Sequence, residues 1–139
     1  MGELKREMTR VYTAAAGIFL LLQGTSTLLF RLIPALDEAF PFLLGITQMI
    51  PPHSILHIIT GLLALGILFS SWSRGAYWFA LGFGLFYIAL GLIGLFTGQP
   101  AYLGMQHFDH PFHILLGGLG LSAAWADVYR QQKKEQVSL

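Results

Sequence analysis

The 139-residue chain contains no cysteine. This absence excludes disulfide bonds, thiolate metal ligands and cysteine nucleophiles. Charged side chains are also scarce: they make up 11% of the residues, whereas a soluble domain usually carries about a quarter. The formal net charge is only +1. The sequence therefore has no large basic surface, and we expect no nucleic-acid partner.

The few charged residues leave four long uncharged stretches between them. These stretches lie between Arg10 and Arg31, Glu38 and Arg74, Arg74 and Asp109, and Asp109 and Asp127. Hydrophobic residues make up 55% of the chain, and a membrane-spanning helix needs roughly 20 consecutive apolar residues. The sequence predicts an all-α, polytopic membrane protein with one domain over residues 1–139. Its four transmembrane helices are expected at about 10–30, 52–72, 75–97 and 111–130.

The connections between these helices differ in length and character. The stretch 31–51 is long and apolar, but Pro34 and Pro41 prevent it from forming one helix. We expect short helical pieces that lie along the outer membrane interface. Pro52 and Pro111 suit the first turn of their helices. Proline lacks a backbone N–H group, and in the first turn such a group would have no partner within the helix. The sequence of residues 70–75, SSWSRG, predicts a tight turn between the second and third helices.

The positions of lysine and arginine predict the orientation of the chain. Seven of these eight residues lie in the N-terminal tail, the 70–75 turn or the C-terminal tail, and Arg31 alone lies on the other side. Cytoplasmic segments carry the excess of lysine and arginine. We therefore expect a multi-pass protein of the inner (cytoplasmic) membrane with both termini in the cytoplasm. Its expected partners are the lipid bilayer, other membrane subunits or further copies of itself.

Two pairs of helices share a sequence pattern. Residues 57–65, HIITGLLAL, align with residues 113–121, HILLGGLGL, at a separation of 56. Residues 17–24 align with residues 84–91 through two glycines and a phenylalanine, at a separation of 67. We interpret the chain as two parallel repeats of one helical hairpin, related by an axis along the membrane normal.

Small residues spaced four apart predict where the helices approach one another closely. Ala80 and Gly84 form one such pair, and Gly118 and Ser122 form another. Patterns of this kind bring membrane helices close together because no side chain keeps the backbones apart. Gln23 is the one amide inside the first helix, and we expect it to hydrogen-bond to another helix.

The candidate site residues are His53, His57, Asp109 and His113. Residues four apart share a helix face, so these four side chains converge if the two halves pack together. Three imidazoles and one carboxylate suit a divalent metal such as zinc, iron or manganese. Alternatively, His57 or His113 binds a haem- or chlorophyll-type tetrapyrrole. In the simplest alternative, the histidines only form hydrogen bonds that anchor the ends of the helices, because unsatisfied polar groups are costly in a bilayer. His107 is expected to be solvated in a loop.

The start of the last helix resembles a known family. The stretch reads Asp109-His110-Pro111-Phe112-His113-Ile114-Leu115-Leu116-Gly117. Its aspartate, histidine, last leucine and glycine match the start of the fourth helix in bacterial four-helix membrane proteins catalogued as a domain of unknown function. His110 stands where that pattern has asparagine, and Phe112 where it has leucine. The resemblance covers the last three helices and implies a four-helix membrane fold without an assigned activity.

The sequence predicts little catalytic chemistry. It has no nucleophile elbow, no phosphate-binding loop and no pair of carboxylates within the predicted helices. We expect a small membrane scaffold or accessory subunit of a larger membrane complex, with no catalysis of its own. The alternative function is metal or tetrapyrrole binding by the histidines at the outer ends of helices 52–72 and 111–130.

Overall fold

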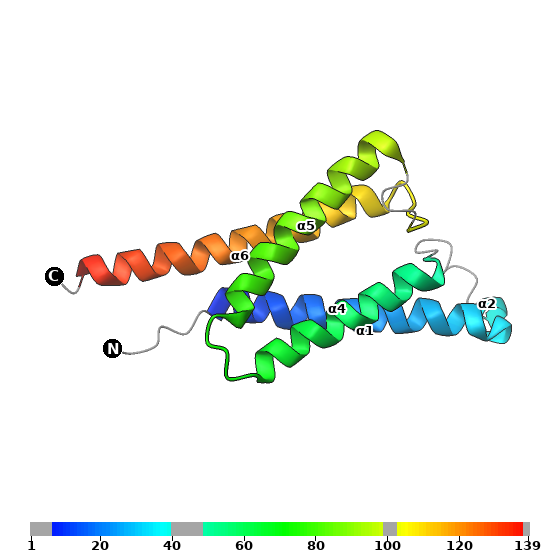
Figure 1. Ribbon diagram of the computed structural model, residues 1–139, viewed down its shortest axis with the longest axis horizontal. Coiled ribbons are helices and arrows are strands. Elements are labelled where there is room, and N and C mark those ends of the chain that lie inside the picture. Colours follow the sequence, from blue (N-terminus) through cyan, green and yellow to red (C-terminus); the bar gives the residue numbers. More distant parts are fainter. Residues whose placement is uncertain (1–6, 40–48, 99–102, 138–139) are drawn as a thin grey trace.

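The structure is a computed structural model that describes residues 7–39, 49–98 and 103–137 (Figure 1). The described residues form helices and connecting loops, with no strand among them. The helices are α1 (Glu7–Leu32), α2 (Pro34–Ala39), α4 (Pro51–Phe69), α5 (Gly75–Thr97) and α6 (Asp109–Val137). The helix α2 lies in the connection for which short helical pieces were expected; residues 40–48 of that connection fall outside the described residues.

The predicted helices are present, and α5 has the predicted bounds. α4 ends at Phe69, three residues before its approximate predicted end, because Ser70 adopts an extended backbone and its N–H and hydroxyl both donate to the carbonyl of Ile67. α6 continues seven residues past the predicted end. Its added residues include lysine, glutamine and glutamate, which favour helix without needing a bilayer.

Three of the described helices are long and apolar enough to cross a membrane: Met8–Leu32, Pro51–Phe69 and Gly75–Thr97. The protein is therefore an integral membrane protein. The predicted fourth span, in α6, is not among these three. The reason is composition, since α6 carries two aspartates and two histidines within 19 residues at its start.

The long helices pack as two hairpins, α1 with α4 and α5 with α6. α1 also contacts α5 and α6, whereas α4 and α5 share only a small contact. Figure 1 shows α1 crossing α4 and α5 crossing α6, with the α4–α5 turn toward the same end as both termini. The apolar core lies where the pairs meet; it consists of Ala16, Leu20, Ala64, Phe79, Phe83 and Tyr87.

Glycine allows the helices of each hairpin to approach closely. A Cβ atom on Gly61 would lie 2.8 Å from the carbonyl oxygen of Gly17, and one on Gly117 would lie 2.6 Å from the carbonyl oxygen of Gly84. Both distances are too short for a carbon–oxygen contact. Any larger residue at these two positions must push the helices apart, so glycine is required by packing.

A second pair of close contacts lies nearer the start of α4 and α6. A Cβ atom on Gly24 would lie 2.6 Å from the carbonyl oxygen of Ser54, and one on Gly91 would lie 2.6 Å from that of His110. These two contacts join positions that the sequence alignments at separations of 67 and 56 place together. The two hairpins thus use matching contacts along their length.

The expectation that Gly118 and Ser122 mediate close helix packing is wrong. The space around Gly118 is open to 4 Å, and Ser122 is exposed. Close packing on α6 uses Gly117 and Gly120 instead; a Cβ atom on Gly120 would lie 2.8 Å from the carbonyl oxygen of Ala80. The sequence contains small residues at several spacings here, and their spacing alone does not tell which side of the helix faces α5.

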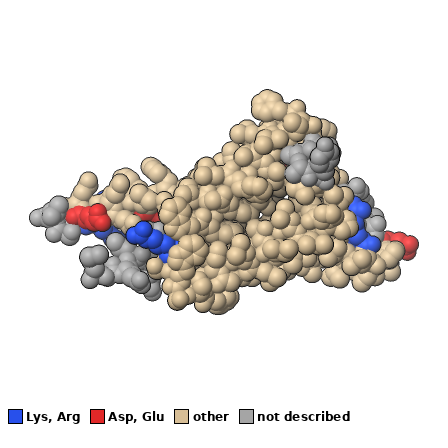
Figure 2. Space-filling view, in the orientation of Figure 1, with Lys and Arg blue, Asp and Glu red and all other residues tan. Residues whose placement is uncertain are grey.

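Two polar contacts tie the ends of the bundle. Asp127 in α6 is buried, and its carboxylate accepts hydrogen bonds from the backbone N–H groups of Met8 and Thr9 and from the Thr9 hydroxyl. At the opposite end, the Nε–H group of Arg31 donates to the carbonyl of Met49. Figure 2 shows charged side chains gathered at the two ends of the visible face, with an uncharged middle. This distribution suits a bundle that crosses the apolar part of a bilayer.

Candidate metal centre

Three of the predicted site residues meet inside the bundle. His53 and His57 come from α4 and His113 from α6, and each offers one ring nitrogen within 4.8 Å of the others. Their side chains are almost completely buried, with exposed fractions of 2%, 4% and 3%. The proximity of His57 and His113 was predicted from their aligned motifs and is confirmed. We call His53, His57 and His113 the histidine cluster.

The start of α4 places two of these rings together. Pro51 and Pro52 occupy the first positions of the helix, where the missing N–H group costs nothing. His53 and His57 follow at a spacing of four, so they share one face. Their Nε2 atoms lie 3.1 Å apart, and the rings meet edge to face.

His57 is held by partners from two further helices. Its Nδ1 lies 3.1 Å from the amide oxygen of Gln23 in α1, and its Nε2 lies 3.3 Å from the hydroxyl of Tyr87 in α5. An amide oxygen only accepts hydrogen bonds, so Nδ1 of His57 carries the proton and Nε2 presents a lone pair. The expected hydrogen bond between Gln23 and another helix is confirmed.

Sequence reasoning missed Tyr87. This residue is buried, and its ring contacts His113 edge to face at a centroid distance of 4.7 Å. The signal was present, because Tyr87 is the one hydroxyl in the middle of an otherwise apolar helix. Such a group needs a hydrogen-bonding partner inside a membrane protein, and the histidines of helices 52–72 and 111–130 were the available partners.

Other ring nitrogens of the cluster have no hydrogen-bonding partner. Among the described residues, nothing bonds to Nδ1 of His53 or Nδ1 of His113, although both atoms are buried. Buried polar atoms in folded proteins are nearly always bonded, and an orphaned one calls for an explanation such as a bound ion or water. The cluster therefore retains unused capacity to bind a ligand.

Asp109 does not belong to the histidine cluster. Its buried carboxylate accepts a 2.7 Å hydrogen bond from the backbone N–H of Gln106, in the loop before α6. Among the described residues it bonds neither the first turn of the helix nor a histidine, contrary to expectation, because the turn over residues 106–109 presents the N–H of Gln106 to the carboxylate. The backbone N–H of Asp109 in turn donates to the carbonyl of Gln106.

The remaining histidines lie apart from the cluster. His110 is buried against Gly94, where a Cβ atom would overlap its ring, and neither of its nitrogens has a partner among the described residues. His107 is exposed in the loop, as expected. Neither histidine joins a group of three ligand residues in the described part of the chain.

A cavity of about 50 Å³ adjoins the cluster. Its polar lining comes from His53, His57, Tyr87 and Thr60. The other lining residues are apolar: Leu56, Phe83, Phe86, Leu90 and Leu103. The cavity is large enough for one or a few small molecules and excludes larger ones.

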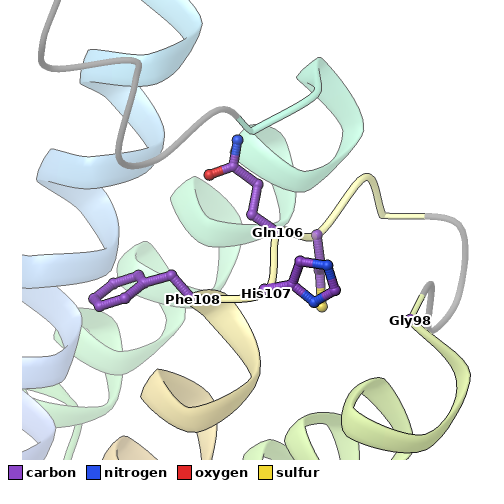
Figure 3. Close-up of a pocket in the computed structure, with 5 residues that line it drawn as sticks. Gly98, Gln106, His107 and Phe108 are labelled. Carbon is purple, nitrogen blue, oxygen red and sulfur yellow. The ribbon is translucent and has the colours of Figure 1, made fainter.

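A larger hollow of about 580 Å³ lies near the end of α5 (Figure 3). It is lined by Gly98, Met105, Gln106, His107 and Phe108. In the close-up, the side chains of Gln106, His107 and Phe108 extend in different directions and do not converge on one point. The histidine cluster is the better candidate for binding because its groups do converge.

These features define a class of protein, an integral membrane helical bundle with a buried cluster of histidines. The chain matches the model of the family described as Domain of unknown function (DUF4383) over residues 10–126. It belongs to this family, which confirms the resemblance seen at the start of the last helix. No curated protein and no solved structure matches the chain.

Proposed function

We propose that this protein binds one divalent transition-metal ion inside the membrane through His53, His57 and His113. The observation that supports the proposal is the convergence of three buried imidazole nitrogens within 4.8 Å of one another. Imidazole suits zinc, copper, iron and nickel. Because the chain has no cysteine to add a thiolate, zinc bound by nitrogen and oxygen ligands is the natural first ion to test.

The distances within the cluster fit one shared ion. Two nitrogens bound to zinc at about 2.0–2.1 Å in tetrahedral geometry lie roughly 3.3–3.4 Å apart. The Nε2 atoms of His53 and His57 already lie 3.1 Å apart. The ligand nitrogen of His113 lies within 4.8 Å of the other two. It therefore has to approach by at most about 1.5 Å, which a small rotation of the ring achieves.

Gln23 supports the proposal from outside the ligand set. In metal sites, the second ring N–H of a ligand histidine usually donates to an acceptor that fixes the ring and makes the ligand nitrogen more basic. The amide oxygen of Gln23 accepts from Nδ1 of His57 in this way. It leaves Nε2 of His57 unprotonated and directed toward His53, which is the state that a metal requires.

The same geometry favours an ion over a tetrapyrrole. His57 and His113 are buried between helices and face each other within the histidine cluster. The adjoining cavity measures about 50 Å³, whereas pockets for cofactors of this size have volumes of roughly 300 Å³ or more. A haem or chlorophyll would have to separate α4 from α6 before either histidine reached its metal.

The membrane arrangement that we propose has four spans, with α6 as the fourth. Asp109, His110, His113 and Asp127 are the polar residues that lower its apolar character, and all four are buried within the bundle. Its exposed side includes Leu115, Leu119 and Trp125, which suits contact with lipid. We further propose that the matching glycine contacts reflect a duplicated hairpin, as the aligned motifs predict.

The proposed orientation follows from the basic residues. The histidine cluster lies in the half of the bundle where Arg31 is the single basic residue, so both termini are assigned to the cytoplasm. A reporter that is active only in the cytoplasm, fused after Leu139, should be active. Activity of a periplasmic reporter at that position would place the histidine cluster on the cytoplasmic side instead.

Metal analysis of the purified full-length chain tests the proposed function. We expect the detergent-solubilised protein to bind zinc with a stoichiometry near one and the double variant His57→Asn, His113→Asn to bind none. His107→Asn is the matched control, because His107 is exposed and lies outside the cluster. If the wild-type chain binds no zinc, copper or iron, the histidines only anchor helix ends. The scaffold or accessory-subunit function then becomes the proposal.

A further inference from the structure

The three histidines do not complete the coordination of a metal ion. Among the described residues, no fourth histidine, aspartate or glutamate belongs to the cluster. Asp109, the expected fourth ligand, is bonded to the loop through Gln106. Zinc with three protein ligands keeps its fourth position for water or another exogenous molecule, whereas purely structural zinc sites have four protein ligands.

Space for such a molecule exists on one side of the cluster. The cavity of about 50 Å³ is bordered by His53, His57 and Tyr87. One water molecule occupies about 30 Å³ in the liquid, so the cavity accepts water, hydroxide or an anion of about three heavy atoms. The apolar side chains of Phe83 and Leu90 on its walls give a larger or strongly hydrated ligand nothing to bind.

The Tyr87 hydroxyl is the group that would hold this molecule. In the structure it donates toward Nε2 of His57 across 3.3 Å. A metal ion bound at Nε2 takes the lone pair that accepts this hydrogen bond. The buried hydroxyl then needs another acceptor, since leaving it unsatisfied is costly. A ligand on the metal, within the cavity that Tyr87 lines, is in the right place to accept.

We infer that the metal ion keeps one open coordination position, facing this cavity, where it binds a small anionic or neutral oxygen- or nitrogen-donor ligand that also accepts a hydrogen bond from Tyr87. This inference rests on the proposed metal site. It adds that the site is of the open kind, which exchanges small ligands, rather than a closed structural one.

Cobalt substitution and azide titration test the inference. Cobalt(II) takes the same ligands as zinc, and its visible absorption bands change with coordination. We expect the cobalt-loaded full-length protein to show a saturable change of these bands with azide. Tyr87→Phe should still bind cobalt but bind azide about tenfold more weakly, because it lacks the hydrogen bond. Helix content and thermal unfolding of each variant confirm that it folds.

The matched control is Tyr12→Phe. Tyr12 is partly buried, and its hydroxyl donates to the carbonyl of Leu116 rather than to the cluster. This variant should bind azide as the wild type does. Equal azide affinity in Tyr87→Phe and the wild type would overturn the part assigned to the hydroxyl.

The remaining outcomes separate the two proposals. If cobalt binds stoichiometrically but its bands do not respond to azide, the site is closed; this inference then fails, and the proposed function stands. If no cobalt, zinc, copper or iron binds, the proposed function fails first.

Discussion

The two hairpins have matching backbone contacts but fill one corresponding place with different side chains. In the α1–α4 hairpin, the hydroxyls of Thr27 and Ser54 hydrogen-bond each other at 2.9 Å. At the aligned place in the α5–α6 hairpin, Gly94 makes room for the ring of His110, whose nitrogens have no partner among the described residues. At this place the first hairpin pairs its two hydroxyls with each other, whereas the second leaves the ring nitrogens of His110 without a partner among the described residues.

The same contrast holds one helical turn further into the bundle. Gln23 accepts a hydrogen bond from His57 in the first hairpin. The residue aligned with Gln23 in the second hairpin is Leu90, which offers His113 no hydrogen bond, and Nδ1 of His113 has no partner among the described residues. The first hairpin therefore fixes the orientation of His57 with a hydrogen bond, whereas the second offers no such acceptor to Nδ1 of His113.

The largest effect should come from breaking the contacts that the hairpins share. Gly61→Ala and Gly117→Ala each place a Cβ atom less than 3 Å from a backbone carbonyl oxygen of the partner helix. Each substitution should lower the free energy of unfolding in detergent by about 1–3 kcal/mol, as overpacking does elsewhere. The two effects should be similar and additive, because the sites lie in different hairpins.

Gly66→Ala and Gly118→Ala are the controls for that pair. Nothing lies within 4 Å of a Cβ atom at either position. Both should be neutral or should stabilise the protein by up to about 1 kcal/mol, the gain from replacing glycine inside a helix. A large loss in only one of Gly61→Ala and Gly117→Ala would contradict the equivalence of the two hairpins.

An effect smaller than that of the two glycine substitutions together should follow from removing the contact between α6 and the start of α1, at the end of the bundle opposite the cluster. Asp127→Ala removes the carboxylate that accepts hydrogen bonds from the N–H groups of Met8 and Thr9 and from the Thr9 hydroxyl. We expect the free energy of unfolding to fall by about 2 kcal/mol, measured by denaturation in mixed micelles. The metal affinity should not change. A loss of metal binding would show that the two ends of the bundle are coupled.

Replacing Gln23, which accepts a hydrogen bond from His57 but has no counterpart beside His113, should weaken metal binding. Gln23→Leu gives the first hairpin the side chain of the second, and His57 then loses the acceptor for its Nδ1 proton. Loss of such a partner typically weakens metal affinity about 10- to 100-fold, measurable by competition with a chelating indicator. Gln23→Glu keeps an acceptor and should retain most of the affinity. Unchanged affinity in Gln23→Leu would show that the amide does not orient the ring.

The smallest effect should come from the hydroxyl pair near the start of α4. Thr27→Val removes the hydrogen bond to Ser54 while keeping the shape of the side chain. Hydrogen bonds between membrane helices average about 0.6 kcal/mol, so the loss of unfolding free energy should be of that size. Ser26→Ala is the control, because Ser26 is exposed and bonds only within its own helix.

Much of the fold could be predicted from the spacing of charges and prolines. Uncharged stretches predicted the long helices, and α5 was placed to the residue, because glycine and an arginine turn bound it at its start and glycine again at its end. The end of α4 and the length of α6 were less predictable. They depend on local hydrogen bonds at Ser70 and on how far a polar helix continues beyond the apolar region.

By itself, the sequence determined that the chain is a helical membrane protein, because apolar periodicity is a local property, and its aligned motifs predicted that His57 and His113 lie near each other. Only the tertiary structure decided what surrounds the histidine cluster. It brought Tyr87 and Gln23 to His57 from two other helices and left Asp109 bonded to its own loop. The rotation of each helix about its own axis decides which side chains meet. Glycine contacts between neighbouring helices set that rotation, and the sequence pattern of a single helix does not.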